Sequence, residues 1–438
     1  MITIISHIKA VIFHQKWLVF LVFISFSIGL ILVLLKGFNQ YNFGDAPDYI
    51  NAAPSIFNNT PYLRENLAWP FFRAPGYPFA ISSIWTLAGF QGIWILKVFN
   101  VMCHSMSTYL VFRISRFSLS EKQSFLVALF YIFNPFSLLQ LSGVQTEPLI
   151  TCLFLAFVYL ICVEPSSLRT FLLALVSVFT IATRPEYLFV IIPILFLSLF
   201  LEQFPKGSKL RGIIVIAMII ISLSWWGVQN EKATGSFLPL TDATNFQLWQ
   251  GSTTVIQQNY PLRTPPSLDF TNDQMKRLVT EIRDQEALWG KDYLIASISS
   301  KSEFWKRAYL ENIKENPARY VKFTLLKSLI FWRPFLNPPS YGLKVTIGSS
   351  FVLLPMTLFM IFGIIRYRKQ KDSQLLVLSF TIGCIALTLI HAAQLPDVRY
   401  KIPLFVPFAT LMAGRLISDW SPRFKSILCK IKLRRVSE

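Results

Sequence analysis

Residues 17–35 read WLVFLVFISFSIGLILVLL, an unbroken apolar stretch without a charged side chain. A helix needs about 20 apolar residues to cross the roughly 30 Å hydrocarbon core of a bilayer, so this stretch predicts a membrane-spanning helix. It is longer than the apolar core of a secretory signal and lacks a small-residue cleavage site. We therefore expect the helix to be retained.

Further stretches of similar length and composition follow along the chain. They cover 92–112, 123–141, 147–163, 168–183, 185–203, 211–229, 345–365, 374–393 and 402–420. Each is long enough, or nearly so, to cross the bilayer as a helix. The sequence therefore predicts an all-α polytopic membrane protein with about ten transmembrane helices and helical outer loops.

The composition argues against several other classes of protein. Of 438 residues, 53% are hydrophobic and 15% are charged, and the mean hydropathy is +0.49. A soluble domain carries about 25% charged residues, so we do not expect a water-soluble enzyme, a nucleic-acid-binding protein or a disordered chain. The cysteines lie in apolar runs or in the basic tail without metal-like spacing, so neither a disulfide nor a zinc site is expected.

The net charge of +19 reflects Lys and Arg residues that gather in one set of loops. With the N-terminus in the cytoplasm, the basic segments at 113–122, 206–211 and 366–371 and the tail after 415 all fall on the same side. Short loops rich in Lys and Arg stay cytoplasmic. The sequence therefore predicts a multi-pass protein of the cell (inner) membrane with both termini in the cytoplasm.

Two long segments, 36–91 and 230–344, then fall on the non-cytoplasmic face. They divide the chain into three parts. Residues 1–229 form an N-terminal transmembrane module that includes the first outer loop, and residues 230–344 form a helical non-cytoplasmic region. Residues 345–438 carry the C-terminal transmembrane helices and the basic tail.

Helical spacing inside the second outer region predicts an amphipathic helix near 275–289 and another helix over 292–316 that stops before Pro317. The run 318–332 is interpreted as a helix at the membrane interface. A crossing there would place the basic loop at 366–371 outside the cell.

Polar residues at the outer ends of the predicted helices are candidates for chemistry. Asp45 and Asp48, in FGDAPDY, could act as a general base or bind a divalent cation, although Asp is also common in turns and helix caps. Arg73, in RAPGYP, is the residue type that recognises phosphate through two parallel hydrogen bonds. Its alternative role is that of an interfacial Arg that reaches towards lipid headgroups.

Three further clusters are Thr146-Glu147-Pro148, Thr183-Arg184-Pro185-Glu186 and the DVRYKIP segment at 397–403. Ionisable residues at membrane depth are usually functional, but near the interface they also serve as caps, ion pairs and anchors. His391, at the end of a predicted span, is interpreted as a packing residue.

The joint distribution of these clusters is more informative than any one of them. They come from distant segments and all map to one membrane face. A transporter would place its charges near the midplane, on broken helices. The pattern therefore favours chemistry at the outer interface on a lipid-linked substrate.

The order of the motifs resembles the GT-C membrane glycosyltransferases, and most closely the branch that contains protein O-mannosyltransferases and the lipid A aminoarabinose transferase. The matching motifs are DxxxY at 45–49, RxPGYP at 73–78, TEPL at 146–149, RPE at 184–186, GSFLPL at 235–240, NPARY at 316–320 and RYKIP at 399–403. The resemblance implies a polyprenyl-phosphate-sugar donor. It also implies inverting transfer to a lipid, glycan or protein acceptor on the non-cytoplasmic face.

The resemblance also implies roles for single residues. Asp45 matches the family's catalytic acidic residue and would be the general base, with Asp48 beside it. The donor phosphate would be bound by Arg73, Arg184 and Arg399, and further substrate contacts would come from Tyr49, Tyr77, Glu147, Glu186, Tyr400 and Lys401. No metal site is assigned, but a divalent cation at Asp45 and Asp48 stays open.

Two alternatives remain at this point. An O-antigen ligase or polymerase is also multi-spanning with a large outer loop, but it would place functional Arg and His residues in that loop. A flippase or transporter of lipid-linked sugars would need no catalytic carboxylate. A ligase would use a polyprenyl-diphosphate glycan rather than a monophosphate sugar, so the donor distinguishes it from the enzyme class favoured above.

Overall fold

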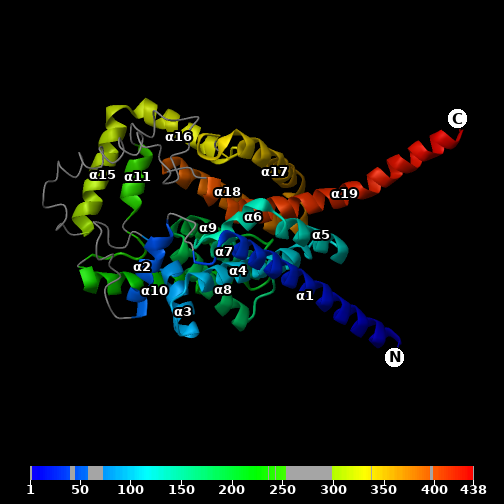
Figure 1. Ribbon diagram of the computed structural model, residues 1–438, viewed down its shortest axis with the longest axis horizontal. Helices are drawn as coiled ribbons and strands as arrows, with labels where there is room; N and C mark the ends of the chain where they lie inside the picture. Colours follow the sequence, from blue (N-terminus) through cyan, green and yellow to red (C-terminus); the bar gives the residue numbers. More distant parts are fainter. Residues whose placement is uncertain are drawn as a thin grey trace.

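Helices account for the regular structure of the described residues, and no strand occurs among them (Figure 1). The computed structural model describes residues 2–39, 45–57, 73–234, 236–241, 243–252, 298–336, 338–394 and 398–437. The all-α class predicted from the sequence is confirmed.

Every stretch predicted to cross the membrane coincides with a helix or a helix pair. These are α1 (Ile2–Lys36), α4 (Ile93–Ser115), α5 (Glu121–Ile132) with α6 (Pro135–Leu139) and η1 (Gln140–Ser142), α7 (Glu147–Cys162), α8 (Ser167–Thr183), η2 (Pro185–Tyr187) with α9 (Leu188–Leu197), α10 (Ser208–Thr234), α17 (Pro338–Tyr367), α18 (Lys371–Ala393) and α19 (Ile402–Ser437). Among the described residues, 6 helices are long and apolar enough to span a membrane, or 7 if the bent α5–α6 pair counts as one span. The α7, α8 and η2–α9 helices are apolar but shorter, so the predicted count of about ten spans is not confirmed.

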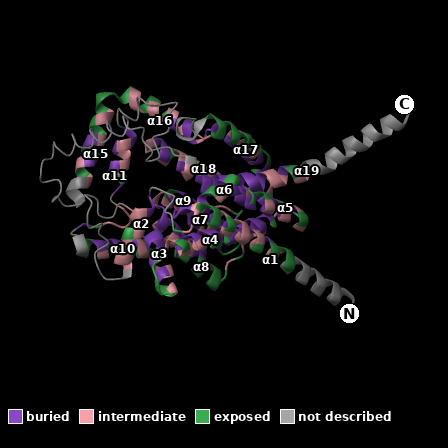
Figure 2. Cartoon of the chain, in the orientation of Figure 1, coloured by how far each residue is buried: buried purple, intermediate pink, exposed green. Residues whose placement is uncertain are grey.

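Aromatic side chains hold the N-terminal and C-terminal halves of the bundle together, and buried residues concentrate there (Figure 2). Phe154 of α7 meets Phe380 of α18 edge to face at 5.5 Å between ring centroids, and Phe380 stacks on Phe408 of α19 at 4.4 Å. Within a bilayer, such contacts stabilise helix association through close packing rather than through removal from water. The two halves of the chain therefore form one packed unit.

The first outer segment contains two helices, α2 (Ala46–Phe57) and α3 (Gly76–Ala88). Gly76 begins α3 directly against the end of α8. A Cβ atom added there would lie 2.5 Å from the backbone nitrogen of Thr183, much closer than real Cβ contacts. Only glycine permits this approach, and it brings Arg73 close to the turn that carries Arg184.

Three helices of the second outer region, α11 (Thr244–Ser252), α15 (Ile298–Glu315) and α16 (Pro317–Phe331), lie at the end of the molecule opposite to the two chain termini (Figure 1). Trp249 of α11 and Trp305 of α15 pack with their ring centroids 4.4 Å apart. The end of α15 before Pro317 agrees with the sequence prediction. The amphipathic helix predicted near 275–289 lies outside the described residues.

The short helix α16 has 15 residues and packs beside α18. Val321, Leu325 and Leu329 are exposed and share one face at a four-residue spacing. An apolar face of this kind suits a helix at a membrane interface. The interfacial location of α16 stays a prediction, because no membrane is present in the structure.

Candidate active site

The first acidic pair, Asp45 and Asp48, lies where α2 begins, and it is bridged by Arg73. The Nη2 atom of Arg73 donates to Asp45 Oδ1 at 2.7 Å and to Asp48 Oδ2 at 3.0 Å, and its Nε donates to Asp48 Oδ2 at 3.2 Å. Asp45 is 7% exposed. One guanidinium group therefore holds both carboxylates in fixed positions across the first outer segment.

The second oxygen of Asp45 is held by a cation from the far end of the chain. Arg399 lies in η3 (Val398–Tyr400), between α18 and α19. Its Nη2 lies 3.0 Å from Asp45 Oδ2. Burial works against ionisation of Asp45, but Arg73 and Arg399 outweigh it and hold the pKa of this carboxyl below its ordinary value. Asp45 is therefore an ionised carboxylate between two guanidinium groups.

Arg184 forms a second ionic cluster beside the first. Its Nη2 donates to Glu147 Oε1, its Nη1 donates to Glu186 Oε1 at 3.1 Å, and its Nε donates to Thr146 Oγ1 at 3.0 Å. Glu147 is 1% exposed and Arg184 is 8% exposed. Buried charges persist when they are paired and hydrogen-bonded, so these contacts explain how an Arg–Glu pair is kept beside apolar helices.

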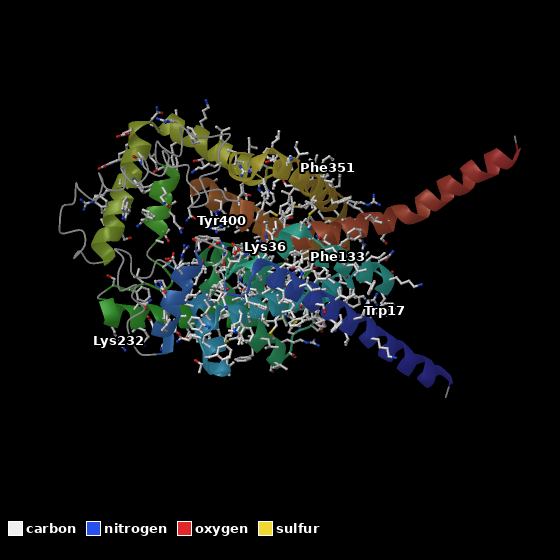
Figure 3. All side chains as sticks on the ribbon, in the orientation of Figure 1. Trp17, Lys36, Phe133, Lys232, Phe351 and Tyr400 are labelled. Atoms are coloured by element: carbon white, nitrogen blue, oxygen red, sulfur yellow. The ribbon has the colours of Figure 1, made fainter. Side chains whose placement is uncertain are left out.

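Tyr400 joins the two clusters, and it lies near the end of α18 (Figure 3). The guanidinium carbons of Arg184 and Arg399 each lie 4.8 Å from the centre of its ring. Its hydroxyl oxygen accepts a hydrogen bond of 2.9 Å from Arg399 Nη2. Cation–π contacts of this geometry are attractive, so Tyr400 relieves the repulsion between two neighbouring cations.

Two further tyrosines, Tyr49 and Tyr77, pack against the first cluster. The Tyr49 ring lies 5.2 Å from the guanidinium carbon of Arg73 and meets the Tyr77 ring edge to face at 5.1 Å. Tyr77 is fully buried, and its hydroxyl donates a long hydrogen bond of 3.5 Å to Asn100 of α4. Tyr77 thus supports Tyr49, and a substrate contact by Tyr77 stays a prediction.

The structure brings together all but one of the residues that the sequence singled out for a site. Those that converge are Asp45, Asp48, Tyr49, Arg73, Tyr77, Glu147, Arg184, Glu186, Arg399 and Tyr400. They come from five separate segments, at 45–49, 73–77, 147, 184–186 and 399–400. Convergence establishes their proximity, and the role of each residue stays a prediction.

Lys401 is the exception. Its Nζ donates to the backbone oxygen of Arg333 at 2.9 Å, and it lies 5.6 Å from the Trp332 ring and 5.4 Å from the Phe405 ring. The side chain is 1% exposed, and burial lowers its pKa to about 7. Lys401 therefore anchors the segment after α16, and a substrate contact by this residue stays a prediction.

Two residues without an expected site role, His391 and Lys327, pack next to the cluster or to the helix end beside it. The His391 ring stacks on the Tyr400 ring at 4.6 Å, and Lys327 of α16 binds backbone oxygens at the end of α18. Sequence spacing does not distinguish His391 from any buried histidine. Lys327 did carry a signal, because it is a single cation in the run TLLKSLIFW.

Asp45 and Asp48 do not form a ready cation site. Both oxygens of Asp45 and one oxygen of Asp48 accept hydrogen bonds or ion pairs from Arg73 and Arg399. Among the described residues, no three His, Cys, Asp or Glu side chains come together as metal ligands. Two guanidinium groups beside the carboxylates would repel a divalent cation. The arrangement of Asp45 and Asp48 therefore favours ion pairing with arginine over metal binding.

A comparison with protein families gives one match over part of the chain. Residues 72–226 match the model of a family described as dolichyl-phosphate-mannose-protein mannosyltransferase. The matched range includes Arg73, Glu147, Arg184 and Glu186, but it excludes Asp45 and Arg399. A comparison with curated proteins finds no match.

Solved structures resemble the whole described fold. The archaeal oligosaccharyltransferase AglB from Archaeoglobus fulgidus, in complex with an inhibitory peptide and a dolichol-phosphate, is 11% identical with a TM-score of 0.50, and the match covers 95% of this chain and 52% of AglB. A structure of the Archaeoglobus fulgidus oligosaccharyltransferase in complex with Zn and sulfate is 11% identical with a TM-score of 0.53, and the match covers 94% of this chain and 51% of that enzyme. The chain thus spans about half the length of these enzymes, and at this identity the likeness establishes the fold.

Proposed function

We propose that this chain, which has the fold of the GT-C membrane glycosyltransferases, transfers a sugar from a polyprenyl-phosphate donor to an acceptor hydroxyl. The observation that carries the proposal is the position of Asp45 between two arginines. Its Oδ1 lies 2.7 Å from Arg73 Nη2, and its Oδ2 lies 3.0 Å from Arg399 Nη2. A carboxylate beside phosphate-binding cations is what sugar transfer from a lipid phosphate requires. The name of the matching family describes a lipid-phosphate-linked sugar, which supports this class of donor.

The reaction would be a single displacement with inversion. The acceptor oxygen forms a bond to the anomeric carbon while its proton moves to Asp45. The bond between the anomeric carbon and the phosphate oxygen breaks on the opposite face. The polyprenyl phosphate leaves with the bonding electrons, and it is already ionised, so no strong general acid is needed. Guanidinium groups stabilise the charge that develops on the leaving oxygen.

Donor binding would also activate the base. Arg73 and Arg399 contact both Asp45 oxygens and, against the opposing effect of burial, hold the pKa of this carboxyl below its ordinary value. A donor phosphate would compete for the same guanidinium donors and neutralise part of their charge. Asp45 would then lose the contacts that lower its pKa, and it would become a stronger base when the donor is in place.

Arg184 would act on the site through Tyr400 rather than through the donor phosphate. Its Nη and Nε donors already contact Glu147, Glu186 and Thr146. The face of its guanidinium group meets the Tyr400 ring. The Arg184 side chain is also less accessible, at 9% exposed against 19% for Arg73 and 27% for Arg399, so we assign phosphate binding to Arg73 and Arg399.

The reaction would take place on the non-cytoplasmic face of the cell membrane. Both chain termini project from one end of the bundle, and α11, α15 and α16 lie at the other end (Figure 1). The basic loops support a cytoplasmic location for the termini. Asp45 follows the far end of α1, and Arg399 follows the far end of α18, so both would face the opposite compartment.

Donor consumption by the purified chain in nanodiscs tests the proposal. Polyprenyl-phosphate hexoses and pentoses are each offered with lipid, glycan and peptide acceptors, and the release of polyprenyl phosphate is measured. We expect release with at least one monophosphate sugar and almost none after Asp45→Asn. Asp419→Asn is the matched control, because Asp419 also pairs with an arginine, Arg366, at 3.0 Å in the middle of α19.

Other outcomes would support the alternatives. Consumption of a polyprenyl-diphosphate glycan but of no monophosphate sugar would indicate a ligase or polymerase. Movement of intact donor across the bilayer without release of polyprenyl phosphate would indicate a flippase. Unchanged release by Asp45→Asn would remove Asp45 from the mechanism.

A further inference from the structure

Three planar rings from three separate segments stack in a row next to the site. Phe331 of α16 lies 5.1 Å from His391 of α18 with an interplanar angle of 20°. His391 lies 4.6 Å from Tyr400 of η3 with an interplanar angle of 8°. His391 is the middle ring and is 3% exposed. Its two faces therefore connect α16 to the segment that carries Arg399.

The far end of this row reaches the candidate catalytic carboxylate. The hydroxyl of Tyr400 accepts a hydrogen bond from Arg399 Nη2, and the same Nη2 lies 3.0 Å from Asp45. Arg184 and Arg399 both contact the Tyr400 ring. A rotation or shift of Tyr400 would therefore move Arg399 relative to Asp45.

The near end of the row is held by two buried lysines. Lys327, one helical turn before Phe331, donates through Nζ to the backbone oxygens of Ala393 and Gln394 at 3.1 Å each, where α18 ends. Lys401, just before α19, donates through Nζ to the backbone oxygen of Arg333, just after α16. Lys327 thus joins α16 to the end of α18, and Lys401 joins the start of α19 to the segment after α16.

A second buried histidine shows what simple packing looks like in the same chain. His104 of α4 stacks on Tyr131 of α5 at 5.1 Å and 26°, and it is 2% exposed. Tyr131 lies within the hydrophobic core. Tyr400, in contrast, contacts two arginines of the site. The partner of the stacked ring, rather than the stack itself, distinguishes His391 from His104.

We propose that His391 is a positioning residue for donor recognition: its ring holds Tyr400 between Arg184 and Arg399 and so keeps the Arg399 guanidinium group aimed at Asp45 and the donor phosphate. The inference rests on the proposed function, because it assumes that Arg399 binds a phosphate. It gives α16, a helix of the outer region, a direct influence on the geometry of the site.

Replacement of His391 by two residues separates ring geometry from simple volume. Phe keeps a flat ring between Phe331 and Tyr400, whereas Leu fills space without a plane. The assay is binding of a polyprenyl phosphate that carries no sugar, together with donor KM and kcat. We expect His391→Leu to weaken binding and raise KM by about tenfold, with a smaller change in kcat, because one charge-assisted contact is misaligned. His391→Phe should stay within about twofold of the wild-type protein.

Two controls decide between positioning and general destabilisation. His104→Leu should lower the thermal unfolding temperature as much as His391→Leu but leave polyprenyl phosphate binding unchanged. In an Arg399→Gln background, His391→Leu should have little further effect, since the residue that it positions is already absent. Additive losses in the double variant, or equal losses in the Phe and Leu variants, would overturn the proposal.

The proposal and the function on which it rests fail in different ways. A wild-type chain that does not bind polyprenyl phosphate would refute the proposed function. A wild-type chain that binds it, loses binding after Arg399→Gln and keeps binding after His391→Leu would refute only the role of His391.

Discussion

Arg399, in η3 just before the last helix, forms an ion pair of 3.0 Å with Asp45, which immediately precedes α2. The pair links the two ends of the chain at the candidate site, because it joins the start of α2 to η3, which precedes α19. Neither residue can adopt this arrangement until both halves of the chain have packed. The ionised carboxylate and its two guanidinium partners are thus a product of the complete fold.

Asp45 and Asp48 should differ in their importance for transfer. Asp45→Asn keeps the shape of the side chain but removes the basic oxygen, so the initial rate should fall by about 100- to 10,000-fold. Asp48→Asn removes the charge that Arg73 contacts through Nε and Nη2, and its rate should fall much less. Initial rates of donor consumption at saturating donor test this, and near-normal transfer by Asp45→Asn with an inactive Asp48→Asn would show that the carboxylates were assigned in the wrong order.

Arg73 should contribute mainly to donor affinity. Arg73→Ala removes charge-assisted contacts, each of which contributes about 1.5–3 kcal/mol, so donor binding should weaken by about 10- to 100-fold. Arg73→Lys keeps the charge but not the planar fork and should recover only part of the affinity. Titration of the variants with donor gives the result, and wild-type affinity in Arg73→Ala would exclude a phosphate contact by this residue.

The pH dependence of transfer should report the two arginines beside Asp45. Burial raises the pKa of Asp45, but Arg73 and Arg399 together lower it by more than burial raises it. The pKa of Asp45 therefore lies below its ordinary value. A base works only when it is ionised, so the acid limb of kcat/KM should lie below the pH at which an ordinary aspartate titrates. Donor binding would remove part of the lowering, so the acid limb of kcat should lie at a higher pH.

Arg399→Gln should shift the first of these limbs. The variant removes one cause of the lowered pKa and leaves the burial that raises it, so the limb of kcat/KM should move to higher pH. Stabilisation by the Asp45 ion pairs is present above the unfolded pKa and is lost as the pH falls through the folded pKa. A pH profile of Arg399→Gln that coincides with that of the wild-type protein would contradict this account.

Lys327 should make stability depend on alkaline pH. Its Nζ donates to the oxygens of Gly251, Ala393 and Gln394, and burial lowers its pKa from 10.5 to about 7. Between about pH 7 and 10.5 the unfolded chain binds the proton that the folded chain has released, so the free energy of unfolding should rise with pH.

Lys327→Met tests this linkage by thermal unfolding in detergent at several pH values. The variant should be less stable at every pH, because three backbone oxygens lose a donor. It should also show a shallower rise in stability above pH 7, with Lys401 accounting for the remainder. An unchanged slope would mean that Lys327 is not the titrating group.

The membrane topology can be tested by labelling of single cysteines in a cysteine-free background. Lys369 follows α17 and Glu311 lies on α15, and both side chains are exposed. The basic loops predict that a cysteine at position 311 reacts with an impermeant reagent added outside, while one at position 369 does not. The reverse labelling pattern would invert the predicted orientation and move the candidate site to the cytoplasm.

The sequence alone determined where the helices are and which polar segments belong to the candidate site. Apolar length is a local property, and every stretch long enough to suggest a span became a helix or a helix pair. The sequence did not determine the number of spans in the same way, because a run such as 147–163 forms a helix that is short for a bilayer. Charge distribution likewise grouped the motifs around Asp45, Arg73, Arg184 and Arg399 on one face.

Only the tertiary structure decided which of these residues meet and which turn away. Lys401 directly follows Tyr400, yet it points into the core towards Arg333, while Tyr400 contacts Arg184 and Arg399. No local pattern indicates that difference, because it depends on how α16 packs on α18. The same holds for His391, whose role follows from the ring on either side of it. Pairing between distant segments is set by the packing of the whole bundle, and a sequence read segment by segment does not contain it.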